Sequence, residues 1–410
     1  MADKEIRVAI IGTGDISHRH MKVWRHIPQV KVVAAAEIDE KKLKNWGESY
    51  GFDNKDLYTD FRTMLKRDDI DAVDVCVHNN LHAPVAITVM KAGYPCYSEK
   101  PMSGSYYDSK LMLDTARECG VKLAIQISSL FTEQTRIAKK LITKGYLGKL
   151  YHARCIQANY RRRPAVDGPY NMGSRDFINA KTAAHGQILD LGIYDLGQML
   201  YLLGLPELKQ VFGKSYHMID SPIPAKEITI EDMALGLAEY EGGLTLDFQE
   251  ANASNVEISP TFYINGDKGA VNWWNPDGVG GEWSMGNGFG NLLPESMQPG
   301  LRFTGLWEGT HVDCDMRAYF NQMQNRCYDP EMMKWYDNQM HWYKYLIGEL
   351  DDTTRYNTPE IGLAVSLLVD GLFISEMEGR SVSAEEIKDK SRSLAIWRQE
   401  TPWGVFDYDE

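Results

Sequence analysis

Short apolar runs and amphipathic segments alternate over roughly the first third of the chain. The apolar runs predict strands at residues 6–12, 30–38, 71–77, 94–99 and 122–127. The amphipathic segments predict helices at residues 17–26, 39–50, 82–93 and 105–119. Continuous Val, Ile and Ala runs are typical of strands buried on both faces, and strand-helix alternation indicates a parallel sheet. We therefore expect an α/β domain with a doubly wound parallel sheet, ending near residue 128.

The pattern changes after residue 150, where longer segments alternate apolar and polar residues and are joined by Gly-containing turns. These segments predict strands at residues 150–160, 209–218, 233–251 and 261–274. They indicate an α+β domain with a large, mostly antiparallel open sheet. Helices are expected at residues 187–204 and 359–378. Residues 275–335 are rich in Gly, Trp and Met with little periodicity, so we expect an elaborated loop there.

The chain length favours two domains, because 410 residues exceed what one hydrophobic core usually serves. The change of pattern places these domains at residues 1–128 and 129–410. The C-terminal helix at residues 359–378 is expected to pack back near the first domain.

The composition of the chain indicates which kinds of molecule the protein binds. The chain has 57 acidic residues against 44 Lys and Arg, and its formal net charge of −13 disfavours broad attraction to nucleic acid or to an anionic membrane. The N-terminal segment lacks the pattern of a secretory signal, and no run is long enough to span a bilayer. The six cysteines are scattered without a CxxC pair, so we expect reduced thiols in a cytoplasmic protein that binds a small molecule.

The histidines do not indicate a metal site. His18 and His20 are close in sequence, as are His78 and His82. Neither pair has a carboxylate or a third ligand nearby in the sequence that would complete a metal-binding set. We therefore predict no metal, and a structural or cofactor-side role for these residues.

A glycine-containing turn follows the first predicted strand. The segment "IIGTGDIS" places two glycines between that strand and the next helix. Residues without a Cβ allow a tight turn and let the backbone approach a pyrophosphate at the helix N-terminus. Ser17 replaces the third glycine of the usual fingerprint and is small enough for close packing. The turn predicts a dinucleotide site with contacts from Gly12, Thr13, Gly14, Asp15 and Ile16.

An acidic residue indicates which dinucleotide is bound. Glu37 ends the second predicted strand, 23 residues after Gly14, close to the ~20-residue separation in the dinucleotide fingerprint. Its carboxylate can accept hydrogen bonds from ribose hydroxyls but would repel a 2′-phosphate. The sequence therefore favours NAD over NADP as the cofactor.

Four segments occur in an order that resembles one enzyme family. They are "GTGDIS" after the first predicted strand, "HNNLHAPVAITVMKAG" after the third, "SEKP" after the fourth, and "HGQILDLGIYDLGQMLYLLG" from His185. In this order they resemble the glucose-fructose oxidoreductase / inositol dehydrogenase / MocA (Gfo/Idh/MocA) family over nearly the whole chain. The resemblance implies an NAD-binding Rossmann domain and an α+β domain for substrate binding and oligomerisation. It also implies further cofactor contacts from Asn79, His82, Glu99 and Lys100.

The resemblance assigns Lys100 to the reaction. In the family, the lysine of the Glu-Lys-Pro motif lies beside the nicotinamide and a substrate hydroxyl. The chemistry supports this role, because a positive ring and partial desolvation disfavour the charged ammonium and let the amine exchange protons. Pro101 would hold the turn, and the Lys100–Pro101 bond is a candidate for cis geometry.

Asp190 and Tyr194 are four residues apart, which predicts one face of a single helix. The resemblance implies that both contact the substrate; many family members have histidine at the second position, whereas the glucose-fructose oxidoreductase branch has tyrosine. A phenol with a pKa of about 10 is a poor base unless a cation lowers that pKa. We expect Tyr194, assisted by Lys100, to remove the hydroxyl proton while Asp190 orients the sugar. Lys100 itself is the alternative base.

The loop after residue 160 is expected near the substrate. Its run of three arginines, Arg161 to Arg163, could grip an anionic group or a neighbouring subunit, or could be a solvated charge run. The predicted substrate contacts are Tyr160, Arg163, Lys100, Asp190 and Tyr194. Sugar rings or flat aglycones could stack on the tryptophans of the later segment, for which core packing is an equal alternative: Trp273, Trp274, Trp283 and Trp307.

Together these residues predict an NAD-dependent enzyme that oxidises a secondary hydroxyl of a sugar, glycoside or cyclic polyol by hydride transfer to nicotinamide. Ring C3 is a position that related enzymes oxidise. The alternative is a glycosidase that retains NAD and works by transient oxidation and elimination, and net NADH production distinguishes the two. A non-catalytic ligand sensor is disfavoured by the joint presence of Lys100, Asp190 and Tyr194. We expect a homo-oligomer, because the family pairs its open sheets face to face.

Overall fold

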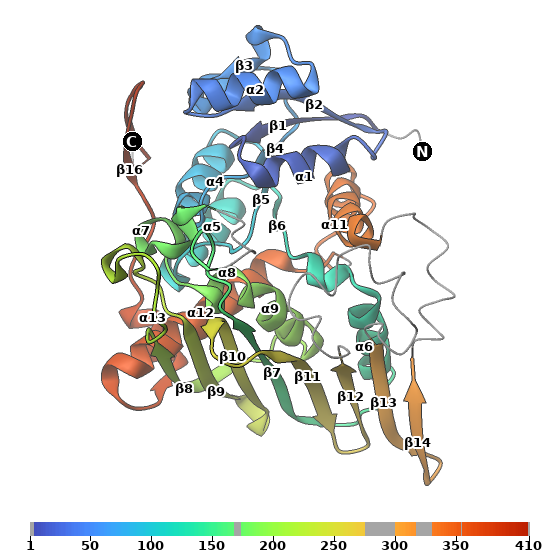
Figure 1. The fold of residues 1–410 in the computed structure, drawn as a ribbon. Helices are drawn as coiled ribbons and strands as arrows, with labels where there is room; N and C mark the ends of the chain where they lie inside the picture. Colours follow the sequence, from blue (N-terminus) through green and yellow to red (C-terminus); the bar gives the residue numbers. More distant parts are fainter. Residues whose placement is uncertain (1–3, 168–173, 275–299, 317–329, 354, 409–410) are drawn as a thin grey trace. The chain divides into compact units, whose positions relative to one another are not determined.

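The computed structural model describes residues 4–167, 174–274, 300–316, 330–353 and 355–408 (Figure 1). The chain divides into two compact units. The first unit comprises Met1–Gln126, Trp335–Leu363 and Arg392–Glu410, and the second comprises Ile127–Lys334 and Ala364–Ser391. The sequence predicts a single cut near residue 128, whereas two later segments return to the first unit.

The first unit is built on a six-stranded sheet with the order β3-β2-β1-β4-β5-β6, in which every pairing is parallel. Its strands are β1 (Ile6–Ile11), β2 (Val30–Ala36), β3 (Leu57–Tyr58), β4 (Ala72–Val75), β5 (Cys96–Ser98) and β6 (Leu123–Ile125). Helices α1 (Asp15–Trp24), α2 (Glu40–Tyr50), α3 (Phe61–Met64), α4 (His82–Lys91) and α5 (Tyr106–Glu118) connect them. The predicted doubly wound parallel sheet is confirmed.

Local sequence explains these elements. β1 is buried along most of its length, as expected for a central strand of a sheet covered on both faces. Helix α2 begins where the Asp39 carboxylate accepts hydrogen bonds from two backbone N–H groups, and ends at Gly51 in the left-handed conformation. The positions of the elements follow from capping residues and apolar runs that are close in sequence.

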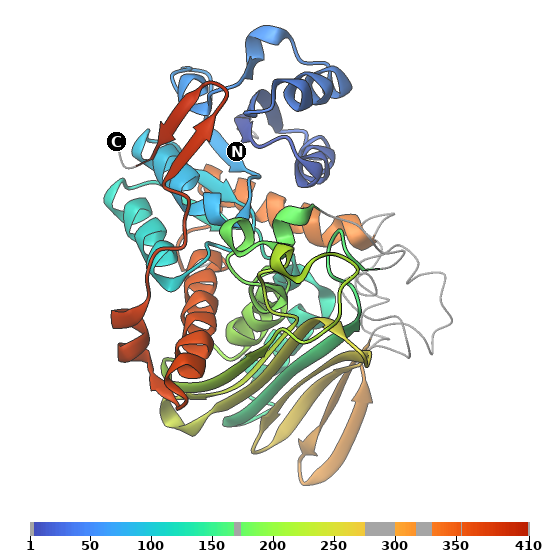
Figure 2. The same ribbon diagram turned by 60° about the vertical axis from the view of Figure 1, so that its left-hand side comes forward.

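The first unit is completed from distant parts of the chain. Helix α11 (Pro330–Ile347) contributes Trp342, whose ring stacks on Tyr97 with centroids 6.1 Å apart. A hairpin of β16 (Arg398–Thr401) and β17 (Gly404–Asp407), dark red in Figure 2, places Phe406 against Phe61. These late segments therefore supply part of the first unit's core.

The second unit is built on a nine-stranded sheet with the order β14-β13-β12-β11-β7-β10-β9-β8-β15. Its strands are β7 (Leu150–Tyr160), β8 (Leu208–Tyr216), β9 (Met233–Tyr240), β10 (Thr245–Ser254), β11 (Ile258–Gly266), β12 (Gly269–Trp274), β13 (Gly300–Trp307), β14 (Thr310–Asp315) and β15 (Val382–Ser383). All pairings are antiparallel except that of β7 with β10. The predicted mostly antiparallel sheet is confirmed.

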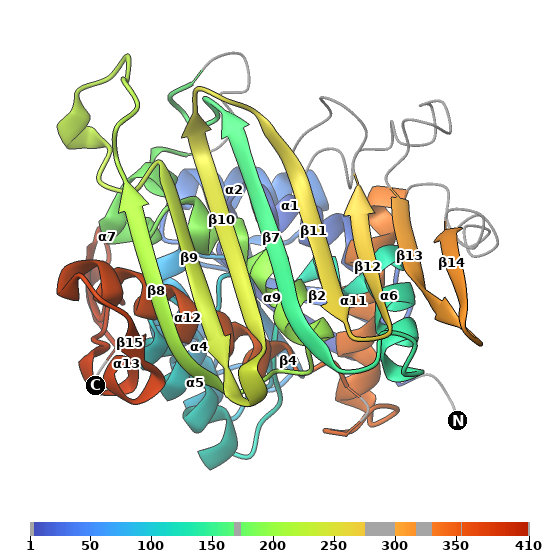
Figure 3. The ribbon, with the colours of Figure 1, turned by 90° about the horizontal axis from the view of Figure 1, so that it is seen from below.

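The two faces of this sheet differ. Figures 1 and 3 show α9 (Gly192–Leu202) and α12 (Thr358–Glu378) on one face. Gly213 points to that face, since a Cβ there would lie 2.4 Å from the Leu372 side chain of α12. The neighbouring Phe212 points to the opposite face, where it is 47% exposed beside its cross-strand partner Leu237, which is 50% exposed.

The sequence interpretation of residues 275–335 is wrong in part. Strands β13 and β14 lie inside this range and extend the sheet from β12. β14 has no buried residue, and its alternation is limited to two apolar positions, Val312 and Cys314, which is a short signal for a strand in the sequence. Residues 275–299 and 317–329 lie outside the described residues.

The second unit also contains further helices: α6 (Glu133–Thr143), α7 (Ala180–Ala183), α8 (Gln187–Asp190) and α13 (Ala384–Lys390). Across the described ranges, no helix has both the length and the apolar character that a membrane crossing requires.

Candidate active site

The glycine-containing turn has the geometry that a dinucleotide needs. Gly12 has a φ of +93°, and a Cβ there would lie 2.4 Å from the Cys76 carbonyl oxygen, so only glycine fits. Gly14 is the N-cap residue of α1, and a Cβ there would meet no described atom within 4 Å. The Ser17 hydroxyl donates to the Gly14 carbonyl at 2.6 Å and accepts from Trp46 Nε1 at 2.9 Å. The backbone at Gly12 is therefore packed tightly against Cys76, whereas the space beside Gly14 at the N-terminus of α1 is open.

The Glu37 carboxylate is fixed at the same turn. Its Oε2 accepts a hydrogen bond from the Thr13 amide at 3.0 Å, and its Oε1 accepts one from the Asp39 amide at 3.1 Å. Thr13 Oγ1 is buried and has no hydrogen-bond partner among the described residues. Asp15 is exposed in the first turn of α1, and Ile16 packs against the core. These residues fit NAD: the N-terminus of α1 would hold the pyrophosphate, and the Glu37 carboxylate would accept hydrogen bonds from the ribose.

Lys100 lies at the same edge of the sheet. It follows β5, and the parallel strands β1, β4 and β5 end at a common edge, where the glycine turn also lies. The Lys100 amide donates to Glu99 Oε2 at 3.0 Å. The Lys100–Pro101 bond is cis, as the sequence predicts.

Asn79 and His82 lie in the segment that follows β4, at the same edge of the sheet. Both are buried, and His82 Nδ1 donates to the Pro101 carbonyl at 2.6 Å. Burial lowers the pKa of His82, which favours its neutral ring. His82 therefore fixes the carbonyl that follows Lys100, while its contact with the cofactor stays a prediction.

A network of buried ionisable side chains lies directly before Lys100, and the sequence analysis missed it. His20 Nδ1 lies 2.9 Å from Asp74 Oδ2, and His20 Nε2 lies 2.8 Å from Glu99 Oε1. Trp24 Nε1 also donates to Asp74, at 2.7 Å. We call Asp74, His20 and Glu99 the His20 network.

The electrostatics of the His20 network favour a protonated His20 beside an ionised Glu99. Burial is the largest single effect on His20 and opposes its protonated form, but Asp74 and Cys76 together outweigh burial and hold the pKa of His20 well above its ordinary value. Burial likewise opposes the ionised form of Glu99, but the hydrogen bond and charge of His20 hold the pKa of Glu99 below its ordinary value. His20 is therefore an imidazolium between two carboxylates.

Cys76 completes the cluster without changing this interpretation. Its Sγ lies 3.5 Å from His20 Nδ1, and the three side chains of His20, Asp74 and Cys76 place potential metal ligands within 4.8 Å of one another. Burial and the nearby Asp74 raise the pKa of the Cys76 thiol to about 12, which disfavours the thiolate that a metal needs. Both ring nitrogens of His20 donate to carboxylates, so the cluster is a hydrogen-bonded network.

In the second unit, Asp190 and Tyr194 lie on successive helices. Asp190 ends α8 and Tyr194 lies in the first turn of α9, so the predicted single helix is interrupted at Leu191. Gly192 starts α9 against β10, where a Cβ would lie 3.1 Å from Glu250 Cγ. The interruption accompanies this close approach. Tyr194 is 7% exposed, and its carbonyl accepts a hydrogen bond from the Ser129 hydroxyl at 2.7 Å.

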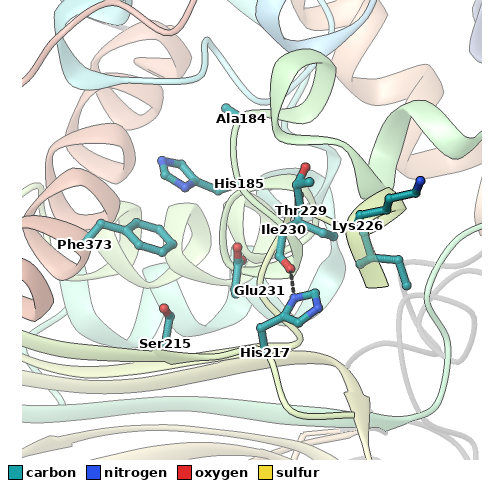
Figure 4. Close-up of a pocket in the computed structure, with 10 residues that line it drawn as sticks. Ala184, His185, Ser215, His217, Lys226, Thr229, Ile230, Glu231 and Phe373 are labelled. Atoms are coloured by element: carbon teal, nitrogen blue, oxygen red, sulfur yellow. Dashed lines mark hydrogen bonds between the residues drawn. The ribbon is translucent and has the colours of Figure 1, made fainter. Parts of the chain in front are cut away.

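A pocket of about 580 Å³ opens beside the chain that leads into α8 (Figure 4). His185 stacks on Phe373 with ring centroids 4.0 Å apart, and burial lowers the pKa of His185 to about 4. Glu231 lies in the middle of the view, and its Oε2 accepts a hydrogen bond from the Gly186 amide at 2.8 Å. Glu231, which the sequence analysis missed, therefore holds Gly186, the N-cap residue of the helix that ends at Asp190.

The predicted substrate contacts from the loop after β7 have different surroundings. Tyr160 is 55% exposed, and its amide donates to Glu257. Arg163 is only 1% exposed, and its guanidinium donates to the Asp167 carboxylate and to the carbonyls of two further residues, Ile219 and Asp220. The expectation that Arg163 binds substrate is therefore corrected, because its donors are used within the second unit.

The aromatic residues of the later segment give one clear result. Trp273 is 4% exposed within β12, which supports packing rather than a sugar platform. Trp283 lies outside the described residues.

Comparison with known proteins places the chain among oxidoreductases. Residues 6–127 match the model of an oxidoreductase family with an NAD-binding Rossmann fold, and residues 135–272 match the GFO/IDH/MocA C-terminal domain. D-glucoside 3-dehydrogenase of Escherichia coli is 27% identical over 279 residues, which is 65% of this chain and 77% of the relative. The 2,7-anhydro-N-acetylneuraminate hydratase of Mediterraneibacter gnavus is 25% identical over 399 residues, covering 94% and 98% of the two chains.

A solved structure shows the same fold along nearly the whole chain. Levoglucosan dehydrogenase in complex with NADH and levoglucosan matches with a TM-score of 0.73 and 17% identity, covering 93% of this chain and all of that one. The two family models together span more than half of the 410 residues and cover both the NAD-binding turn and the α8–α9 segment. The chain therefore belongs to the Gfo/Idh/MocA family of oxidoreductases, and its first unit is an NAD-binding Rossmann domain.

Proposed function

We propose that the protein is an NAD-dependent dehydrogenase that oxidises a secondary hydroxyl of a sugar or glycoside. The observation that carries this proposal is the position of Lys100, which follows β5 at the sheet edge that also holds the glycine turn. The relatives named for oxidation of D-glucosides and levoglucosan support the substrate class. Bound NAD would supply the hydride acceptor.

We propose separate roles for three side chains. Tyr194, assisted by the positive charge of Lys100, removes the proton of the hydroxyl that is oxidised. Asp190 orients the sugar by accepting hydrogen bonds from its hydroxyls. Lys100 is the competing base. A comparison of the variants Tyr194→Phe and Lys100→Met distinguishes the two candidate bases, because loss of the base lowers kcat/KM on the order of 10²–10⁴-fold.

The test is absorbance at 340 nm with NAD and a panel of sugars, polyols and glycosides. We expect NADH to accumulate with one compound class and not with the Lys100→Ala variant. D-Glucosides come first in the panel, with C3 as the position to examine by NMR of the product, since one relative is a D-glucoside 3-dehydrogenase.

The opposite outcome is equally clear. Release of an aglycone, or addition of water, without NADH accumulation would contradict the dehydrogenase. The comparisons do not favour the NAD-retaining glycosidase over it, although one relative along nearly the whole chain is named a hydratase.

We propose that the second unit pairs with another copy through the open face of its sheet. Phe212 and Leu237 form a cross-strand apolar pair on that face, each about half exposed. Phe212→Lys should reduce the molecular mass measured by light scattering. Met377→Lys is the matched control, because Met377 is 79% exposed on α12. An unchanged mass in Phe212→Lys would exclude this face as the interface.

We also propose that the protein works in the cytoplasm. The five described cysteines are free thiols, which fits a reducing compartment. Cell fractionation with an antibody tests this, and recovery outside the cytoplasmic fraction would contradict it.

A further inference from the structure

The His20 network connects α1 to the loop that carries Lys100. Asp74, His20 and Glu99 are 0%, 0% and 3% exposed, and the hydrogen bonds run from Asp74 through both nitrogens of His20 to Glu99. The second oxygen of Glu99 then accepts the amide hydrogen of Lys100 at 3.0 Å. The conformation of Lys100's backbone therefore depends on where the Glu99 carboxylate is held.

Charge balance explains why two acids can be buried here together. Two carboxylates in a dry interior repel each other, and a protonated imidazole between them compensates one of the two charges. The His20 network then carries one net negative charge immediately before Lys100. The charge of Lys100 in turn helps to keep Glu99 ionised.

Besides Lys100, three ionisable groups face the network, and they carry no charge near neutral pH. They are Cys76, Tyr97 and His82. Burial raises the pKa of Cys76 to about 12 and that of Tyr97 well above its ordinary value. Burial lowers the pKa of His82. All three are therefore neutral in the range where an oxidoreductase of this kind would work.

We propose that His20 is a positioning residue for Lys100, and that the charge balance of the His20 network sets the protonation of the Glu99–Lys100 pair during catalysis. This inference rests on the proposed role of Lys100 in the reaction. His20 acts through Glu99 and does not itself contact the substrate.

The variant His20→Gln tests the proposal, because it removes the positive charge and leaves a side chain that can still donate a hydrogen bond. Glu99 should then bind a proton closer to neutral pH. We expect the acid limb of the kcat/KM profile to move upward by about one pH unit, equivalent to about a tenfold loss on that limb, with recovery at higher pH.

A double variant separates charge from packing. His20→Gln combined with Asp74→Asn again leaves one net negative charge, on Glu99. We expect the double variant to recover most of the activity that His20→Gln alone loses, and to return the acid limb towards its original position. Tyr97→Phe is the matched control, since the Tyr97 ring lies 5.8 Å from that of His20 and its hydroxyl has no hydrogen-bond partner among the described residues, so its profile should not move.

One result would overturn the proposal. A loss of kcat/KM that is equal at every pH in His20→Gln, without recovery in the double variant, would mean that the network only packs the fold. Should His20→Gln fail to fold, His20→Asn carries the same test, because it removes the same positive charge and also keeps an amide that can donate a hydrogen bond.

Histidine NMR provides a readout that needs no substrate. With ¹⁵N-labelled histidine, both ring nitrogens of His20 should be protonated at neutral pH in the original protein and in Tyr97→Phe, and the imidazolium should be lost in Asp74→Asn. A protonated His20 in a protein that oxidises no sugar would refute the proposed function alone. A neutral His20 in an active enzyme would refute the proposal made here.

Discussion

Glu99 of the first unit and Glu250 of the second are both buried acids, but their pKa values are shifted in opposite directions. In the first unit, Glu99 lies against the His20 imidazolium, and its pKa is lowered although burial alone would raise it. In the second unit, Glu250 accepts a hydrogen bond from the neutral Gln157, and burial together with the charge of Asp195 raises its pKa well above the ordinary value. The position of one cation, rather than burial, decides whether an acid is a carboxylate or a carboxylic acid.

The same difference applies to the surroundings of two side chains that we propose take part in the reaction, Lys100 and Tyr194. Lys100 follows a network that is charged, whereas Tyr194 is followed in α9 by Asp195, which lies against the protonated Glu250. A change of charge is therefore expected to affect Glu99 more strongly than Glu250.

The largest effect is expected where a buried cation of the second unit is removed. Arg163 donates to Asp167 and lies 3.4 Å from Asp232. Arg163→Met leaves both carboxylates unpaired, so the free energy of unfolding in urea should fall by about 4 kcal/mol. Arg161→Met, at a more exposed position in the same run, should change it by less than about 1 kcal/mol. Equal effects of the two substitutions would refute the pairing.

Replacing each acid by its amide tests the contrast directly. Glu99→Gln deprives the buried imidazolium of one carboxylate and should lower the free energy of unfolding by about 3 kcal/mol. Glu250→Gln replaces a group that already carries a proton and should change it by less than about 1 kcal/mol. Urea unfolding of both variants measures the difference, and a similar cost for both would break the comparison.

The pH dependence of stability extends this comparison to another buried acid of the second unit, Glu231. Burial raises the pKa of Glu231 from 4.5 to about 7, so the folded state keeps a proton that the unfolded state releases. Stability from this group is therefore highest below the unfolded pKa and is lost as the pH rises through about 7, by up to about 3 kcal/mol. Thermal unfolding across this range should show a smaller decline in Glu231→Gln. An identical decline would assign the effect to other groups.

The smallest effect is expected at Tyr97. Its ring lies 5.8 Å from that of His20, but its buried hydroxyl has no hydrogen-bond partner among the described residues. Tyr97→Phe should change the free energy of unfolding by less than about 0.5 kcal/mol, because no hydrogen bond is lost. A loss above about 1 kcal/mol would show that the His20 network extends to Tyr97.

The sequence predicts the parts of the fold that depend on neighbouring residues. The strands and helices of the first sheet, the Gly12 turn and the Lys100–Pro101 geometry follow from apolar runs, capping residues and a short motif. The His20 network does not, because the partners of His20 lie 54 and 79 residues away. A histidine on an amphipathic helix gives no sign of two distant carboxylates.

Local patterns fail for a related reason in the second unit. Three consecutive arginines look alike in the sequence, yet only Arg163 is enclosed, because Asp167 and the distant Asp232 lie around it. The interruption at Leu191 likewise depends on how closely Gly192 approaches β10. Both features are set by tertiary packing.

Because the first unit is built from three separate segments of the chain, the direction of synthesis affects when this unit can finish folding. A ribosome completes residues 1–126 early, but Trp342 and the β16–β17 hairpin emerge only after the first segment of the second unit, Ile127–Lys334. Domains that are continuous can fold as they emerge, N-terminal part first. In this protein Tyr97 and Phe61 of the nascent Rossmann sheet lack their aromatic partners until late in synthesis. The final folding step of the sheet therefore follows synthesis of nearly the whole chain.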